Sequence, residues 1–375
     1  MSQLNPRMNN TYPDYVYFDV NVSAQNQTSG EPAAFSYSEV RSSPFLSGPA
    51  EDYKMSIIRF SCESNSPVFL PAIQPNQPSP DLTTYAISFV HNGATHTEYM
   101  NWLPEMANIP KPPPPSSLPN GALYASGYYD CSTYGWLMFN LNLLAKNCMS
   151  KVGDVAQTPL FTWDPTRNCM DIYFTDSFNV HWREPTPDNP SNVTTPEYQM
   201  FFNIPLLQLF NTLPHQFCGY NGQYGVTPEL NYYIPCEDRT VNQVSGRFKV
   251  TQEEPTTTLL SPFTALVFTS NSLPIVATQV SSPQIYSNGV LLSSGSSKDT
   301  ANIMSDIRTD DGVYSPSVLY EPSSQYRFVT LMGNQPLYRL DIQVYLRLRS
   351  GDLYPLRLRN GCNLTCKLLF QKLSV

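Results

Sequence analysis

The sequence predicts an all-β protein with one or two short helices, and three observations support this prediction. The chain has 35 prolines in 375 residues, and proline disfavours long helices because it lacks the amide hydrogen that helical turns use. It also has 24 tyrosines, a residue type that is enriched in strands. Several segments alternate apolar and polar residues, which is the pattern of strands with one buried face.

Strands are predicted in order along the chain from this alternation and from turn residues. Residues 14–22, "DYVYFDVNV", place four apolar side chains on one face, and residues 52–62 and 83–93 follow as further strands. The third of these strands ends in Asn92-Gly93, a dipeptide typical of hairpin turns because both residues tolerate positive φ.

An insertion or second β subdomain is expected at about residues 111–235. It begins with "KPPPPSSLPNG", residues 111–121, which should form an extended polyproline spacer. The best helix candidate is 134–150, where apolar residues recur at helical spacing. A second, short helix is predicted after Asn203, with Asn203 as its N-cap and Pro205 in its first turn.

Beyond the insertion, the sequence again favours strands. Residues 264–280, "TALVFTSNSLPIVATQV", give strand material that Pro274 interrupts. Residues 287–306 are polar and rich in serine, so we expect a surface loop there.

The closing segment, residues 336–375, is basic in an otherwise acidic chain, with seven of the 22 Lys and Arg residues and only two acidic residues. Between Tyr338 and Phe370 the even-numbered positions are apolar or nearly so, and the odd-numbered positions are mostly polar or charged. Gly351 and Gly361 mark two turns. This pattern predicts a three-stranded antiparallel meander with one buried face.

The odd-numbered face of this segment is a candidate subunit interface. Arginines on a strand face can meet acidic surface on a neighbouring subunit, because complementary charge steers subunits onto one another. Two alternatives stay open: the arginines solvate the sheet face and protect its edges, or they contact nucleic acid. The candidate interface residues are Arg339, Arg347, Arg349, Arg357 and Arg359.

The content of charged residues and of cysteine narrows the classes of protein to which this chain can belong. Only 14% of residues are charged, against about 25% in ordinary soluble proteins, so we infer a subunit that several neighbours cover at once. The net charge of −8 argues against packaging nucleic acid as the main role. The eight cysteines are expected to be reduced, buried thiols.

The N-terminal residues 1–11 are expected to form a flexible polar arm with one basic residue, Arg7. This segment lacks the apolar core of a signal peptide, so we expect a protein made in the cytoplasm or nucleus. No stretch approaches the roughly 18 consecutive apolar residues that a membrane span needs.

No motif for catalysis, for a cofactor or for a metal ion is recognisable, so we expect no enzyme and no cofactor. The chain contains no G-x-S-x-G, P-loop or G-x-G-x-x-G sequence. His91 and His96 have the spacing of a zinc-finger histidine pair, but no close cysteine pair precedes them. Asp306, Asp310 and Asp311 do not match the spacing of an EF-hand loop.

Several segments resemble the minor capsid, or penton, proteins of polinton-like viruses and virophages. The resemblance spans most of the chain. It rests on the N-terminal strand region and on "FFNIPLLQLFNTLP" at 201–214. Above all it rests on "TALVFTSNSLPIVATQV" at 264–280, "SPSVLYEPSSQYRFVTL" at 315–331 and "PLYRLDIQVYLRLRSGDLYPLRL" at 336–358.

The resemblance implies a jelly-roll β-sandwich with an inserted β-rich region, acting as a structural protein of the virion. Five copies would plug each fivefold vertex of an icosahedral capsid, in contact with the major capsid protein. A vertex fibre or a host receptor would be a further candidate partner.

Two other classes remain open from the sequence. A double jelly-roll major capsid protein would show two similar eight-strand halves, which are not visible. A carbohydrate- or receptor-binding β-sandwich would need an exposed aromatic platform, which tyrosine-rich strand faces could supply.

Overall fold

The computed structural model shows two compact units. Unit 1 comprises Met1–Ser66, Phe263–Thr309 and Ser315–Val375, and unit 2 comprises Pro67–Pro262 and Asp310–Tyr314. The insertion expected at about 111–235 lies within unit 2. The structure describes residues 14–24, 33–63, 82–105, 131, 133–181, 196–218, 230–237, 242–260, 263–276, 278–279, 284–287, 290–294, 300–308, 317–322, 326–348, 353–358 and 361–373, so the predicted arm at 1–11 and spacer at 111–121 lie outside the described residues.

Unit 1 is built on eight strands, which we call the first to the eighth in chain order. They are β1 (Tyr15–Ser23), β3 (Ser36–Val40), β4 (Tyr53–Glu63), β16 (Phe263–Thr269), β21 (Ile303–Arg308), β22 (Ser317–Tyr320), β24 (Arg339–Leu348) and β27 (Asn363–Lys372).

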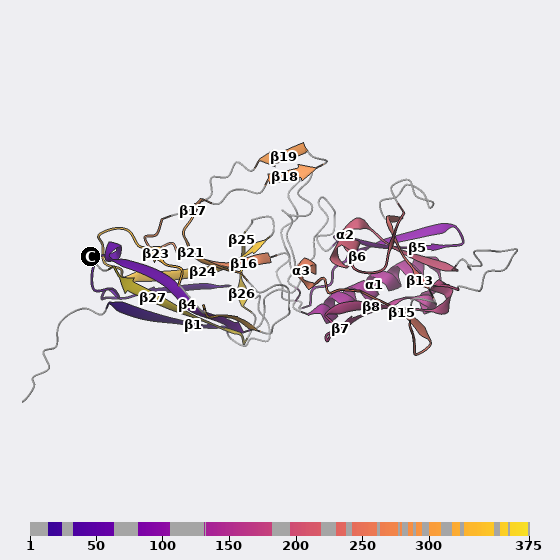
Figure 1. Cartoon of the computed structure of the whole chain (residues 1–375), viewed down its shortest axis with the longest axis horizontal. Coiled ribbons are helices and arrows are strands. Elements are labelled where there is room, and N and C mark those ends of the chain that lie inside the picture. The colour runs from indigo at the N-terminus through magenta and orange to yellow at the C-terminus, as the bar shows by residue number, and fades with distance from the viewer. Residues whose placement is uncertain are drawn as a thin grey trace, which may run out of the picture. The chain divides into compact units, whose positions relative to one another are not determined.

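These eight strands form four nested antiparallel pairs. The first strand pairs with the eighth, the second with the seventh, the third with the sixth and the fourth with the fifth. The pairs alternate between two sheets, the β27 sheet (β1-β27-β4-β22) and the β24 sheet (β3-β24-β16-β21), which form separate layers in Figure 1. This arrangement is a jelly roll, which confirms the predicted fold class.

The two sheets of unit 1 share one hydrophobic core. Phe60 of β4 and Phe268 of β16 meet edge to face across it, with ring centroids 4.9 Å apart, and both are completely buried. The core also takes alternate residues from the other long strands, among them Phe18, Val20, Ile342, Val344, Leu346, Leu364, Leu368 and Phe370.

The closing segment is only partly the three-stranded meander that its alternation predicted. β24 pairs with the strand that follows it, β25 (Leu353–Pro355), as the meander requires, but the third strand does not join them. β24 lies in one sheet and β27 in the other, because the seventh strand of the roll pairs with the second and the eighth with the first. The alternation itself is confirmed, since both strands turn their even-numbered residues into the same core. Exceptions are Tyr338, which is exposed, and Cys362, which is half-buried.

Short elements complete the described part of unit 1. Residues 287–306, predicted to be a loop, contain strands, because their apolar runs are too short for alternation to be recognised. These elements are β2 (Ala33–Ala34), η1 (Ala50–Asp52), β17 (Thr278–Gln279), β18 (Gln284–Ser287), β19 (Val290–Ser294), β20 (Thr300–Ala301), β23 (Val329–Thr330), β25 (Leu353–Pro355) and β26 (Arg357–Leu358).

Unit 2 enters the chain between the third and fourth strands of the roll. Its elements are β5 (Leu82–His91), β6 (Ala94–Asn101), α1 (Tyr134–Val152), η2 (Val155–Gln157), β7 (Leu160–Asp164), β8 (Cys169–Phe174), η3 (Asp176–Phe178), β9 (Asn179–Val180), β10 (Tyr198–Phe202), α2 (Ile204–Leu209), β11 (Gln216–Phe217), β12 (Tyr232–Ile234), β13 (Cys236–Glu237), β14 (Asn242–Val244), β15 (Arg247–Thr251) and α3 (Thr257–Leu260).

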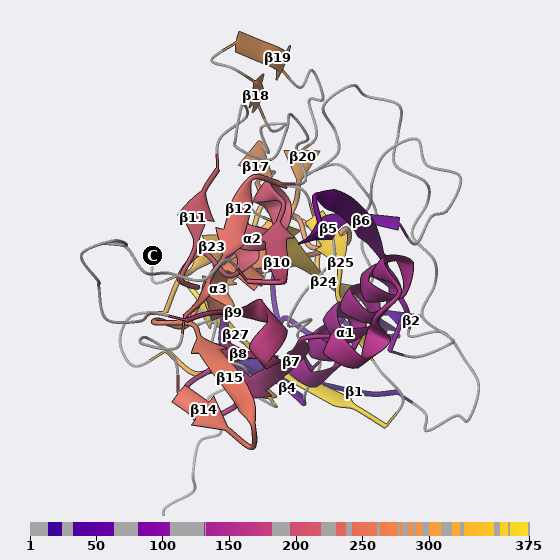
Figure 2. The ribbon, with the colours of Figure 1, turned by 90° about the vertical axis from the view of Figure 1, so that its right-hand side faces the viewer.

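Two sheets of unit 2 pack with α1. One has the order β11-β12-β10-β5-β6 and the other β14-β15-β8-β7. α1 contacts β5, β6 and β7, and so lies beside both sheets (Figure 2). The predicted Asn92-Gly93 turn joins β5 to β6, with φ of 50° and 75° at these two residues.

Two helices of unit 2, α1 and α2, begin at polar caps. Thr133 accepts a hydrogen bond from the Trp136 amide at the start of α1, and Asn203 accepts one from the Leu206 amide at the start of α2. The helix predicted over 134–150 is confirmed as α1, and it runs without a break because no proline falls between Pro119 and Pro159. Among the described residues, no helix is long and apolar enough to cross a membrane.

Phe268→Ala tests the core that joins the two sheets of unit 1. Removing this buried ring should lower the free energy of unfolding by about 3–5 kcal/mol, because a cavity remains opposite Phe60. Urea denaturation monitored by tyrosine and tryptophan fluorescence measures the loss. Leu319→Ala is the matched control, because Leu319 is 67% exposed and its truncation should change stability by no more than about 0.5 kcal/mol. Equal losses in the two variants would contradict the shared core.

Candidate subunit interface

The outer face of the β24 sheet is the face turned away from the core of unit 1. β24 contributes its odd-numbered residues to this face, and register fixes their neighbours on β3 and β16. Because strand residues point alternately to opposite sides, the arginines of β24 share this face while the leucines fill the core.

An ion-pair cluster spans this outer face. Arg347 of β24 reaches across β16 to Asp306 of β21, with 3.4 Å between Nη1 and Oδ2. Arg327 contacts the other oxygen of the same carboxylate, with 3.0 Å between Nη1 and Oδ1. Two guanidinium groups therefore share one carboxylate.

The cluster lies over buried apolar residues. Val267 of β16 is in register with Asp306 on one side and Tyr345 on the other, and it is completely buried. Ala265, next along the same face, is 5% exposed. Val267 and Ala265 are therefore covered by other groups of the chain, although they lie on the face turned away from the core.

The structure locates the predicted interface residues unevenly. Arg339 is exposed at the start of β24, and Arg347 is half-buried near the end of the same strand. The backbone of Arg357 lies in β26, but its side chain is outside the described residues, as are Arg349 and Arg359 entirely.

Sequence reasoning missed two other arginines on or beside this face. Arg308 ends β21 and lies in register with Ala265, directly across β16 from Arg347. Arg327 joins the cluster from the segment before β23. No local pattern could reveal either residue, because both are brought to the face by long-range strand pairing.

Asp341 is the exception on β24, since it is acidic and only 5% exposed. Its carboxylate accepts hydrogen bonds from Ser270 Oγ at 2.9 Å, from the Asn271 amide at 3.0 Å and from the Ser272 amide at 2.6 Å. Burial alone would raise the pKa of Asp341, but the hydrogen bonds from Ser272, Asn271 and Ser270 outweigh it and hold this pKa below its ordinary value. The contact fastens the turn after β16 to β24.

The basic residues of the closing segment divide between opposite sides of unit 1. Lys367 of β27 lies on the outer face of the β27 sheet, where its Nζ is 3.6 Å from Asp19 Oδ2. Arg59 of β4 contacts the other oxygen of Asp19 at 3.7 Å. The single basic face expected from the sequence is therefore two faces, because β24 and β27 belong to different sheets.

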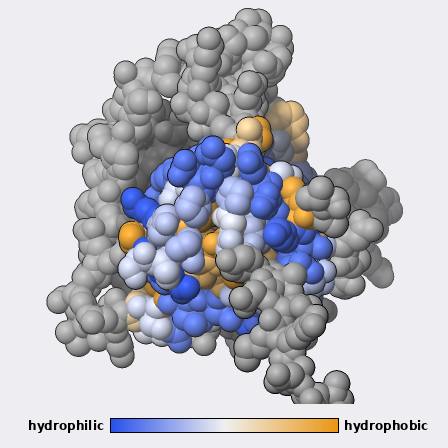
Figure 3. Space-filling view, turned by 90° about the vertical axis from the view of Figure 1, so that its left-hand side faces the viewer, coloured by the Kyte–Doolittle hydropathy of each residue, from blue (hydrophilic) through white to orange (hydrophobic). Residues whose placement is uncertain are grey.

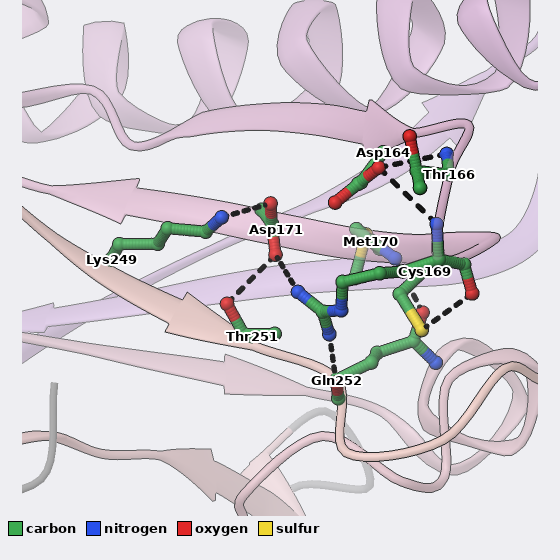
Figure 4. Close-up of polar contacts among 9 residues, drawn as sticks. Asp164, Thr166, Cys169, Met170, Asp171, Lys249, Thr251 and Gln252 are labelled. Carbon is green, nitrogen blue, oxygen red and sulfur yellow. Dashed lines mark hydrogen bonds and ion pairs between the residues drawn. The ribbon is translucent and has the colours of Figure 1, made fainter. Parts of the chain in front are cut away.

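Unit 2 contains a separate polar network around Asp171 (Figure 4). The Asp171 carboxylate contacts Lys249 Nζ at 2.6 Å, accepts a hydrogen bond from Thr251 Oγ1 at 2.8 Å and lies 3.6 Å from Arg167 Nη1. Arg167 also donates to the Gln252 carbonyl at 2.7 Å. The network joins β8 to β15 and is saturated by its own partners, so its role is structural.

Two of the residues considered for metal binding, His91 and Asp306, have other partners. His91 stacks on Tyr198, with ring centroids 4.3 Å apart. Asp306 is held by two arginines, and Asp310 and Asp311 lie outside the described residues. Within the part of the chain that the structure describes, no group of three or more His, Cys, Asp or Glu residues could hold a metal ion.

The surface at the C-terminal side of Figure 1 is shown in Figure 3. Its described part is mostly hydrophilic, and hydrophobic residues are scattered over it without forming one continuous patch. A partner on this side would therefore meet polar groups more than apolar ones.

Comparisons with known proteins relate the whole chain to capsid proteins. A family model described as Sputnik minor capsid protein V18/19 matches residues 16–372. Structural protein V19 of Sputnik virophage is 25% identical over 189 residues, which are 49% of this chain and 84% of V19.

Two solved structures share the fold along nearly the whole chain. A chain in the 3.5 Å cryo-EM structure of the Sputnik virophage matches with a TM-score of 0.71 and 21% identity, covering 96% of this chain and 98% of that chain. The crystal structure of the mavirus penton protein matches with a TM-score of 0.60 and 15% identity, covering 96% and 99%.

Asp341→Asn tests the fastening of the turn after β16. Because the folded-state pKa of Asp341 is lowered, its carboxylate stabilises the fold above its unfolded pKa, and this contribution is lost as pH falls through the folded value. The variant should be less stable than the parent by about 2 kcal/mol at neutral pH. The difference should shrink below the ordinary aspartate pKa of about 4.

Urea denaturation across this pH range measures the difference, and Glu321→Gln, on an exposed residue, is the control for loss of one carboxylate. A gap between parent and Asp341→Asn that stays constant into acid would contradict this account.

Proposed function

The chain belongs to the family of the Sputnik minor capsid protein V18/19, and from this premise we propose that it is a penton subunit, five copies of which cap each fivefold vertex of an icosahedral capsid. The family membership establishes a structural role in the virion, and it confirms the resemblance to virophage minor capsid proteins found in the sequence. The proposal of a penton subunit at the fivefold vertex is supported by the single jelly roll and by the fold shared with the mavirus penton protein.

The organisation of the two units supports this proposal over a double jelly-roll major capsid protein. The eight strands of unit 1 complete one roll. In unit 2 the sheet orders β11-β12-β10-β5-β6 and β14-β15-β8-β7 do not repeat the nested pairs, and a 19-residue helix packs with the sheets. We therefore propose that unit 1 is the jelly-roll domain and unit 2 the insertion.

The proposed partners are other copies of this chain and the major capsid protein. We propose that Arg339, Arg347, Arg349, Arg357 and Arg359 face such neighbours. Synthesis would take place in the host cytoplasm or nucleus.

A second candidate role, contact with a receptor or carbohydrate, rests on aromatic surface in unit 2. Trp136 and Phe139 stack at 4.7 Å between ring centroids on α1, and Phe139 is 45% exposed. Phe217 on β11 is 59% exposed. Exposed aromatic rings of this kind can bind sugars, and a vertex subunit could carry this role in addition.

Oligomeric state tests the proposed function. Native mass spectrometry of the purified full-length chain should show a pentamer, because penton subunits close a fivefold ring. A trimer would instead support a major capsid protein. A stable monomer that binds oligosaccharides in a glycan array would contradict both the penton assignment and the major capsid assignment.

A further inference from the structure

The ion-pair cluster on the outer face of the β24 sheet has more positive than negative charge. Arg308 and Arg347 flank Ala265 from opposite sides in one row of the sheet. Arg347 and Arg327 share the carboxylate of Asp306. Among the described residues no ion pair is found for Arg308, so Arg308, Arg327 and Arg347 outnumber the one aspartate, Asp306, that pairs with two of them.

The two units of the chain differ strongly in charge. Unit 1 contains 14 Lys and Arg residues and 12 Asp and Glu residues, for a net charge of +2. Unit 2 contains 8 Lys and Arg residues and 18 Asp and Glu residues, for a net charge of −10. The acidity of the whole chain therefore belongs to unit 2.

We propose that the basic cluster of Arg308, Arg327 and Arg347 receives the acidic surface of unit 2 from a second copy of the chain. The proposal rests on the proposed function, because it requires several copies in one ring. It adds the partner and the polarity of the contact: unit 1 of each copy meets unit 2 of the next.

Electrostatic attraction favours unit 2 of a second copy as the partner of this basic cluster. Copies that each carry −8 repel one another, and a head-to-tail contact that places unit 2 against unit 1 offsets part of that repulsion. A contact that joins two different surfaces closes a ring when the rotation between copies allows it, as a fivefold ring requires.

The partial burial of the cluster strengthens an electrostatic contact with a second copy. The Arg347 side chain is only 31% exposed, whereas that of Arg327 is 69% exposed, so the partly buried charge of the cluster is Arg347. Partly buried charges are screened by salt less than fully exposed ones. A carboxylate docked between these arginines would also be shielded by the neighbouring subunit.

Cross-linking tests the identity of the partner. In Arg308→Lys the new amine can form an amide with a carboxylate in direct contact when a carbodiimide is added. We expect zero-length links from position 308 to Asp or Glu residues between 67 and 262. A mixture of copies labelled with nitrogen-14 and nitrogen-15 should show that these links join different copies.

The outcomes separate this proposal from the proposed function. A parent chain that is monomeric by native mass spectrometry would overturn both. Pentamers in which position 308 links only within one copy, only to unit 1 or not at all would overturn the contact and leave the penton assignment intact.

Charge reversal provides the second measurement. Arg308→Glu should raise the protein concentration at which half the chain is assembled by about tenfold or more, because like charges then face each other. Arg59→Glu is the matched control, since it makes the same charge change on the opposite sheet of unit 1. Equal effects of the two variants would overturn the proposal. So would unchanged assembly of Arg308→Glu combined with lost retention of a DNA oligonucleotide, which would identify nucleic acid as the occupant.

Discussion

The pairing of β1 with β27 is the contact on which the rest of unit 1 depends. Nine residue pairs, from Tyr15 with Gln371 to Ser23 with Asn363, bring the two ends of the described chain together. The other three strand pairs nest inside this one, and the roll alternates them between two sheets. A domain as large as unit 2 can interrupt the roll between the third and fourth strands because the nested pairs on either side of it remain intact.

The pairing of β1 with β27 also determines on which faces of unit 1 the basic residues of the closing segment lie. The two closing strands bury their even-numbered residues in one core but present their basic residues on opposite sides of unit 1. On one side, arginines converge on Asp306 over a buried valine; on the other, Lys367 and Arg59 share Asp19. The first side has surplus positive charge, and unit 2 holds the surplus negative charge of the chain.

Local properties could be predicted from the sequence, and long-range pairing could not. Alternation correctly identified β1, β4 and the buried face of β24, and the capped segment after Asn203 became α2. Alternation states which side of a strand is buried but not which strand lies beside it. The meander was therefore right for the pairing of β24 with β25 and wrong for β27, which pairs with β1 and β4. For the same reason Arg308 and Arg327 were missed, and Arg347 was found without its partner Asp306.

The central claim is that a single jelly roll with one large insertion forms the vertex of a capsid. A cryo-EM reconstruction of the particle that contains this chain tests it most directly. We expect density for unit 1 in five copies around each fivefold axis, with β1 and β27 as neighbours in one sheet. Density for this chain in the faces of the capsid, away from the fivefold axes, would contradict it.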